Sequence, residues 1–159
     1  VGKSHLARER GDLLGGYYLK AQNKWWDGYE GEPVVILDDF DEGGVCLKHY
    51  LKIWADKYAA RGEIKGATTG LAHREFIITS NYSIGQIFQD TDSVTVEAIT
   101  RRFRVIEIPS RTQYPDVKTL KRDVDQYLTG VKREPERVRP SVVGSNRMTF
   151  TEGDVYGKK

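Results

Sequence analysis

Two adjacent carboxylates, Asp38 and Asp39, directly follow the aliphatic residues 34–37. Such a run predicts a strand that is buried on both faces, as in a parallel sheet. Open α/β sheets bind their ligands at the carboxyl ends of such strands. One carboxylate at this place can hold a divalent cation, while its neighbour orients or deprotonates a water molecule. Asp is also common in turns, so the pair alone leaves both interpretations open.

The sequence Gly2-Lys3-Ser4, followed by the helix-compatible residues 5–10, matches the end of the phosphate-binding pattern G-x-x-x-x-G-K-[ST]. In that loop, backbone N–H groups hold phosphates, the Lys contacts the β and γ phosphates, and the hydroxyl binds Mg²⁺. A match of three residues often occurs by chance. Here, however, the three residues precede the acidic pair by about 35 residues, which is a normal spacing between a phosphate-binding loop and a metal-binding strand. We therefore expect a fragment that begins inside its own nucleotide site, without the N-terminal strand and the start of the phosphate loop. Alone, such a fragment should bind ATP poorly and be inactive.

Two later segments, a strand and a hairpin, carry further candidate residues. Residues 75–81 predict a second buried strand that ends in polar side chains, the last of which is Asn81. If this strand lies beside the first, Asn81 comes close to a γ-phosphate and can position the attacking water; otherwise it opens a turn. Residues 63–73 predict a glycine-rich hairpin with Lys65 at its tip. Lys65 is then either a phosphate contact on a nucleic-acid strand or an ordinary solvated lysine.

A pair of arginines and a pair of tryptophans complete the candidates. Arg101 and Arg102 directly precede the alternating segment 103–109, which predicts a strand. Either arginine could supply positive charge to a phosphate bound by a neighbouring subunit, or both are ordinary surface residues. Trp25 and Trp26 lie in a turn-rich loop. Anchoring that loop on the core is the favoured interpretation, and contact with nucleotide, DNA or another subunit is the alternative.

The elements that must position these residues alternate between strand and helix. The hydrophobic pattern predicts a short strand at 17–19 and helices at 84–88 and from 94 to about 100. It also predicts an amphipathic helix over 45–60 that ends at Arg61-Gly62. Such alternation is typical of an α/β fold built on a parallel sheet.

The C-terminal part of the chain differs from the rest in composition. A last helix is expected at 116–128, and a basic tail rich in Gly, Pro and Ser follows it. A tail with few large apolar residues is expected to be mostly disordered. We divide the chain into a domain at 1–109, a C-terminal helix at 110–129 and the tail at 130–159.

Composition limits the function classes. The length of 159 residues, with 38% hydrophobic and 30% charged residues, suits one rather polar globular domain. No apolar run approaches the length of a membrane span, so we expect no membrane partner. The single Cys46 excludes an intrachain disulfide framework and a cysteine zinc site. A net charge of +2 does not demand a nucleic-acid partner, but it permits one where basic residues cluster.

Taken in order, the motifs read G-K-S, K-W-W-D-G-Y-x-G-E, V-V-I-L-D-D-F, a K-G hairpin, F-I-I-T-S-N and E-A-x-x-R-R. Over residues 1–108, this order resembles the superfamily 3 helicase domain of replication-initiator (Rep) proteins from circular single-stranded DNA viruses, most closely the circovirus-like ones. The W-W-D-G-Y segment with the following D-D-F strand is highly specific to that family. Viral RNA helicases that share the domain are a more distant likeness.

The resemblance implies an α/β P-loop NTPase (AAA+-like) sheet with flanking helices. It implies that Gly2, Lys3 and Ser4 close the Walker A motif, with Lys3 on phosphate and Ser4 on Mg²⁺. Asp38 corresponds to the Walker B acid that is associated with Mg²⁺, and Asp39 corresponds to the acid that activates water.

The same resemblance assigns roles to residues farther along the chain. Asn81 matches the motif C sensor, Lys65 lies in the hairpin that contacts single-stranded DNA, and Arg101 or Arg102 matches the arginine finger, without a choice between them. The implied cofactors are ATP and Mg²⁺. The implied partners are single-stranded DNA and further copies of the chain in a ring, usually a hexamer. Replication of viral DNA would place the protein in the host cell nucleus; otherwise an intracellular location is expected.

Two other functions stay open beside an ATP-driven DNA helicase of rolling-circle replication. One is an RNA helicase of the same family, and the other is a non-catalytic viral remnant that serves as an oligomerisation or DNA-binding module. The endonuclease domain of the family needs a His-hydrophobe-His metal pair. The three histidines His5, His49 and His73 are scattered and form no such pair.

Overall fold

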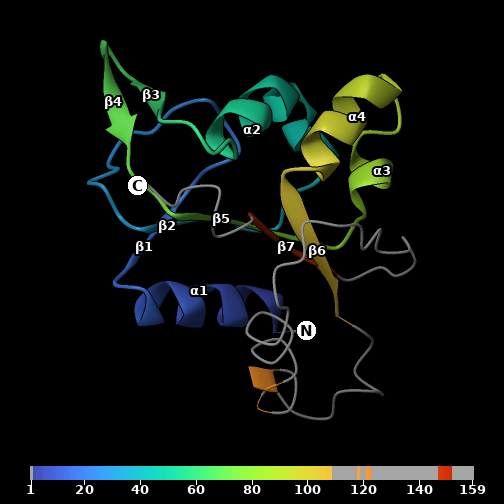
Figure 1. Cartoon of the computed structure of the whole chain (residues 1–159), viewed down its shortest axis with the longest axis horizontal. Coiled ribbons are helices and arrows are strands. Elements are labelled where there is room, and N and C mark those ends of the chain that lie inside the picture. The colour runs from blue at the N-terminus through green and yellow to red at the C-terminus, as the bar shows by residue number, and fades with distance from the viewer. Residues whose placement is uncertain (1, 109–117, 119–120, 123–146, 152–159) are drawn as a thin grey trace.

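The computed structural model describes residues 2–108, 118, 121–122 and 147–151, and a five-stranded sheet forms its centre (Figure 1). The strand order is β1-β2-β5-β7-β6. Strands β1 (Tyr17–Leu19), β2 (Val34–Leu37) and β5 (Glu75–Ser80) are parallel, whereas β7 (Arg147–Thr151) runs antiparallel to both β5 and β6 (Phe103–Glu107). The chain is therefore a mixed α/β protein with a mainly parallel sheet, as the sequence pattern predicted.

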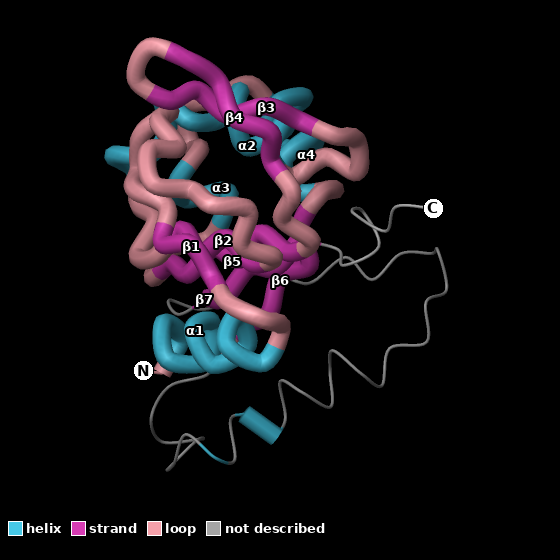
Figure 2. The backbone as a smooth tube through the Cα atoms, turned by 90° about the vertical axis from the view of Figure 1, so that its left-hand side faces the viewer, coloured by secondary structure: helices cyan, strands magenta, loops and turns pink. Residues whose placement is uncertain are grey.

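Helices cover both faces of this sheet. Helix α1 (Lys3–Leu13) lies on one face, while the 3₁₀ helix η1 (Glu42–Leu47) and helices α2 (Lys48–Trp54), α3 (Ile84–Ile87) and α4 (Ser93–Thr100) lie on the other (Figures 1 and 2). Both faces of β2 are consequently buried, and its four residues are all 0% exposed. Val34 and Ile36 pack with Leu6 of α1, whereas Val35 and Leu37 belong to the larger core on the opposite face. The prediction of a doubly buried strand is confirmed.

A second, two-stranded sheet forms a hairpin from β3 (Ala60–Ile64) and β4 (Ala67–Leu71), with Lys65 and Gly66 at the turn. Figure 2 shows the hairpin on the α2 side of the central sheet, away from α1. The predicted hairpin is confirmed, but it begins earlier than expected.

The expected helix over 45–60 is wrong at its C-terminal end. Helix α2 ends at Trp54, and residues 60–64 form strand β3, so Arg61 and Gly62 lie inside a strand rather than after a helix. The reason is a tertiary contact. A Cβ atom on Gly62 would lie 2.5 Å from Cδ1 of the buried Trp26, so the glycine lets the indole ring pack directly on the strand backbone.

The expectation of a mostly disordered tail is wrong for residues 147–151, which form β7 between β5 and β6. The remainder of the predicted tail lies outside the described residues. The predicted last helix at 116–128 lies largely outside them too, although residues 118 and 121–122 are helical. Within the described part of the chain, no helix has both the length and the apolar character that crossing a membrane requires.

Candidate functional site

Lys3 and Asn81 meet at the carboxyl end of the parallel strands. Gly2, in the left-handed conformation with φ of 92°, precedes the first turn of α1, and Lys3 opens that turn. The Nζ atom of Lys3 donates a hydrogen bond of 2.7 Å to Oδ1 of Asn81, which directly follows β5. The two residues are 78 positions apart in the chain. The fold therefore brings together the candidate phosphate-binding lysine and the candidate sensor asparagine.

Asp38 is the centre of a hydrogen-bond network at the end of β2. The register pairs Leu37 with Ile78, so Asp38 and Thr79 follow opposite each other. The Thr79 hydroxyl donates to Oδ1 of Asp38 at 2.5 Å, and Nη2 of Arg8 donates to Oδ2 at 2.9 Å. The Ser4 side chain also hydrogen-bonds to this carboxylate. Burial alone would raise the pKa of Asp38, but its hydrogen bonds and the charge of Arg8 outweigh that effect and hold the pKa below its usual value.

Asp39 has a strained backbone and an exposed position. Its φ of 50° makes it the one non-glycine residue with positive φ in the described part of the chain. Two hydrogen bonds hold this conformation, because the Asp39 N–H donates to the Thr79 hydroxyl at 2.9 Å and the next N–H, that of Phe40, donates to the Thr79 carbonyl at 2.8 Å. Backbone strain of this kind persists where the surrounding structure over-determines it, and it clusters at functional sites.

The electrostatics of the site centre on Lys3, which is 7% exposed. Burial lowers the pKa of Lys3, and the negative charges of Asp39 and Asp38 act in the opposite direction. The ammonium is thus partly desolvated beside two carboxylates. A phosphate group, which carries negative charge and several acceptor oxygens, is the kind of ligand that such a partly buried cation binds well.

Ser4 and Asp38 are the candidate residues for binding a metal ion. No group of three or more His, Cys, Asp or Glu side chains that could hold a metal occurs among the residues the structure describes. Mg²⁺ is commonly bound by one or two carboxylates together with waters and substrate phosphates, rather than by a complete protein cage. One hydroxyl and one carboxylate therefore fit Mg²⁺ that arrives with a phosphorylated ligand, and they do not fit a structural zinc site.

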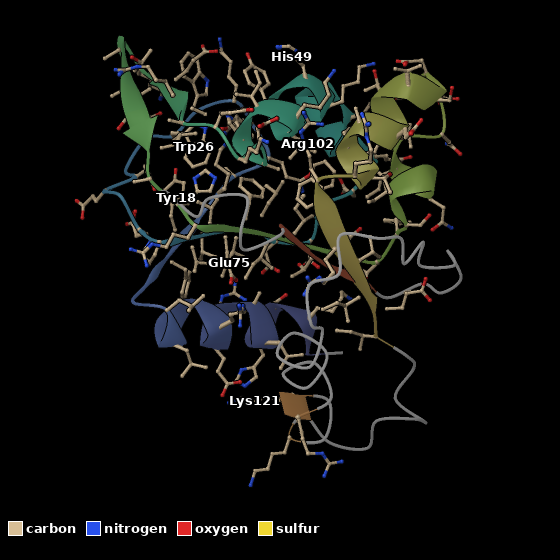
Figure 3. All side chains as sticks on the ribbon, in the orientation of Figure 1. Tyr18, Trp26, His49, Glu75, Arg102 and Lys121 are labelled. Carbon is tan, nitrogen blue, oxygen red and sulfur yellow. The ribbon has the colours of Figure 1, made fainter. Side chains whose placement is uncertain are left out.

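Arg101, Arg102 and Lys65 lie elsewhere. The Arg102 guanidinium contacts Asp56 beside α2, with Nη2 2.8 Å from Oδ2, and donates to the Ala98 carbonyl at 2.6 Å (Figure 3). Arg101 is exposed and directly follows α4. Helix α4 lies on the face of the sheet opposite α1 (Figure 1). Lys65 is at the hairpin turn. These three residues are not part of the cluster around Lys3.

The tryptophan-containing loop supports the hairpin. Trp26 is 0% exposed, stacks with Tyr18 and His73, and donates its backbone N–H to the Glu63 carbonyl at 2.7 Å. Next to it, Oδ1 of Asp27 accepts a 3.0 Å hydrogen bond from the backbone N–H of Lys65. The anchoring interpretation is confirmed for Trp26. The loop also fixes the turn that carries Lys65.

Sequence reasoning missed two residues of the site, Arg8 and Thr79. Thr79 is 0% exposed and is the first polar residue after three apolar residues of β5. This change from apolar to polar residues could have identified Thr79 from the sequence. Arg8 follows Ser4 by four residues, and helix geometry puts positions i and i+4 on one face. That spacing could have placed Arg8 near Ser4, but nothing in the neighbouring sequence identified Asp38 as the partner of Arg8.

A parallel α/β sheet with a lysine at a helix start, facing an acid and an asparagine at strand ends, is compatible with the P-loop class of nucleotide-binding proteins. Comparisons with known proteins narrow this class. The RNA helicase family model matches residues 1–51. The replication-associated protein of Porcine circovirus 1 is 38% identical over 106 residues, which are 67% of this chain and 33% of that protein.

Two further relatives are also replication-associated proteins of viruses. The replication-associated protein of Porcine circovirus 2 is 39% identical over 101 residues (64% of this chain, 32% of that protein), and that of Beak and feather disease virus is 41% identical over 80 residues (50% and 26%). The chain spans about a third or less of the length of these relatives. These findings support a Rep-protein helicase domain, and the resemblance predicted from the sequence is confirmed.

Proposed function

We propose that the chain is the ATPase part of a viral replication initiator, with a P-loop (AAA+-like) fold, and that it moves along single-stranded DNA during rolling-circle replication. The observation that carries the proposal is the convergence of Lys3, Ser4, Asp38 and Asn81 at the carboxyl ends of β2 and β5. The relatives are replication-associated proteins, which supports the same role here. A host-nuclear location follows if the replicated molecule is viral DNA.

In this mechanism Lys3 and the N-terminus of α1 bind the phosphates of ATP, and Ser4 and Asp38 hold the Mg²⁺ that accompanies them. The metal ion, when bound, neutralises charge that develops on the phosphates. Asp39, with its exposed carboxylate and fixed backbone, accepts the proton of the attacking water. Asn81 holds the Lys3 ammonium and orients the water, so each residue acts by position and charge.

We assign the arginine finger to Arg101. Arg102 is engaged by Asp56 and the Ala98 carbonyl of its own chain, which supports a structural role. Arg101 is exposed at the end of α4, where a residue can reach a phosphate in a neighbouring subunit. This assignment requires a ring of subunits, and a hexamer is the expected form. Lys65, at the turn held by Asp27, is the proposed contact to the DNA backbone.

An RNA helicase is the second candidate, favoured by the description of the family that matches residues 1–51. Side-by-side measurement of ATPase stimulation by single-stranded DNA and single-stranded RNA separates the two. We expect stronger stimulation by DNA. A preference for RNA would reassign the substrate but would leave the nucleotide site as proposed.

The decisive experiment is DNA-stimulated ATP hydrolysis by the protein with its complete phosphate-binding loop, compared with Asp39→Asn. We expect hydrolysis to fall at least about 100-fold in the variant while nucleotide binding is retained, because general base catalysis contributes about 10²–10⁴-fold. Undiminished hydrolysis in Asp39→Asn would contradict the role of Asp39. An assembled wild-type protein that binds DNA but does not hydrolyse ATP would favour a non-catalytic DNA-binding module.

A further inference from the structure

We propose that Arg8 is a built-in counter-cation of Asp38 that fixes the carboxylate in place and raises the Mg²⁺ concentration needed to load the nucleotide site. The inference rests on the nucleotide-binding part of the proposed function. Arg8 lies outside the G-K-S motif and has no role in the mechanism described above. Arg8 would position the Asp38 carboxylate, and its positive charge would weaken Mg²⁺ binding.

The hydrogen bonds of Arg8 involve both residues that are available to the metal. Its Nη2 atom lies 2.9 Å from Oδ2 of Asp38, and its Nη1 atom donates to the backbone carbonyl of Ser4 at 3.3 Å. The guanidinium thus spans from the first turn of α1 to the end of β2. Arginine suits this place because its planar group offers several donors in fixed directions.

Both oxygens of the Asp38 carboxylate already accept hydrogen bonds from the protein. Thr79 donates to Oδ1, Arg8 donates to Oδ2, and the Ser4 side chain also hydrogen-bonds to this carboxylate. A carboxylate held in this way is well ordered, but a metal ion or metal-bound water must share its oxygens with these donors or displace one of them. Arg8 can move more readily than Thr79, because the Arg8 side chain is 37% exposed, whereas Thr79 is 0% exposed.

The charge of Arg8 opposes a divalent cation. The positively charged guanidinium offsets the negative charge of the Asp38 carboxylate with which it pairs. Mg²⁺ approaching Ser4 and Asp38 meets a nearly neutral pair rather than a free carboxylate, and it is repelled by the nearby positive charge. Because the site is partly open to solvent, salt screens this repulsion, and we expect an effect of about tenfold in the half-saturating Mg²⁺ concentration at low ionic strength.

Arg10 provides a matched control on the same helix. It forms an ion pair with Glu75 at the opposite end of β5, with Nε 2.6 Å from Oε2. Figure 3 shows Glu75 on the side of the sheet that faces α1. Arg10→Gln therefore removes one positive charge and one ion pair from α1, as Arg8→Gln does, but leaves the surroundings of Asp38 unchanged.

The test is a Mg²⁺ titration of the binding of N-methylanthraniloyl-ADP to the protein with its complete phosphate-binding loop, followed by fluorescence. In Arg8→Gln, we expect the half-saturating Mg²⁺ concentration to fall about tenfold at low salt and by less at high salt. In Arg10→Gln it should match the wild type. Binding of the same nucleotide in EDTA should change much less, whereas a merely structural role of Arg8 would weaken binding with and without the metal.

Arg8→Lys keeps the charge and serves as a second variant should Arg8→Gln fold poorly. We expect its Mg²⁺ requirement to stay within about twofold of the wild type, because the positive charge remains beside Asp38. An unchanged or higher Mg²⁺ requirement in Arg8→Gln, or a tenfold decrease in Arg8→Lys, would overturn the inference. Failure of the wild type to bind the nucleotide at any Mg²⁺ concentration would overturn the proposed function, and this inference with it.

Discussion

His73 should make the folded protein sensitive to mild acid. The side chain is 4% exposed, its ring stacks on Trp26 at 5.7 Å, and Nε2 lies 2.8 Å from the Trp54 carbonyl oxygen. Burial lowers the pKa of His73 from 6.5 to about 4, although the hydrogen bond to Trp54 acts in the opposite direction. The folded state therefore holds the ring neutral over a pH range in which the unfolded chain protonates it.

The sign and size of the effect follow from proton linkage. Between pH 6.5 and about 4 the unfolded state binds more protons, so the free energy of unfolding is highest above pH 6.5 and decreases as pH falls through that range. At about 1.4 kcal/mol for each pH unit, the complete loss is about 3 kcal/mol. Between pH 7 and pH 5 the same relation gives a loss of about 2 kcal/mol.

Urea unfolding followed by tryptophan fluorescence at pH 7 and pH 5 measures this loss, with His73→Gln as the variant. Carboxylates also titrate in this range, so the relevant quantity is the difference between the wild type and the variant, which keeps an amide donor for the Trp54 carbonyl but cannot be charged. We expect the wild type to lose about 2 kcal/mol more than His73→Gln. His49→Gln, at an exposed histidine on α2, should behave like the wild type. Equal pH dependence in wild type and His73→Gln would refute the reasoning.

Three further outcomes are expected. Lys65→Ala should weaken DNA stimulation of ATP hydrolysis and reduce the salt dependence of DNA binding, with basal hydrolysis little changed; an unaltered DNA response would exclude the hairpin contact. Arg101→Ala should lower the ATPase rate about 10³-fold without lowering the melting temperature, whereas Arg102→Ala should lower the melting temperature; the reverse pattern would exchange their roles. Gly62→Ala should destabilise the fold by about 2 kcal/mol in urea unfolding, whereas Gly70→Ala on the paired strand, with no atom within 4 Å of its added Cβ, should not.

The arrangement of the site was predictable because it depends on local patterns that repeat. Residues 34–37 and 76–78 are apolar and indicate buried parallel strands, and polar residues follow both runs. Once two such strands are neighbours, the carboxylate of Asp38 and the amide of Asn81 must lie at the same edge of the sheet. The contact between Lys3 and Asn81 is the physical result of that rule.

Features that depend on distant partners were not predictable. In the sequence, Gly62 looks like a glycine that ends a helix. In the structure it lies in strand β3, where the buried Trp26 packs against it. Arg102 hydrogen-bonds to Asp56, which is 46 residues away in the chain, and no local pattern predicts this contact. Strand β7 was not predicted, because the residues around it in the sequence are polar and rich in glycine and proline. This composition led us to expect disorder, although five residues of the segment pair with β5 and β6.

The hydrogen bonds around the tryptophan-containing loop give the proposed DNA contact and the proposed nucleotide site a common support. Asp27 binds the backbone of Lys65, Trp26 binds that of Glu63, and the loop that holds both residues connects β1 with β2. Because Asp38 directly follows β2, a force applied to the hairpin by a nucleic-acid strand would act on the same loop that leads into the strand before this proposed metal ligand. Trp26 cannot yield to such a force without leaving the core, since it is 0% exposed. If the chain has the proposed function, the hairpin and β2 should therefore move as one unit when the bound nucleotide changes.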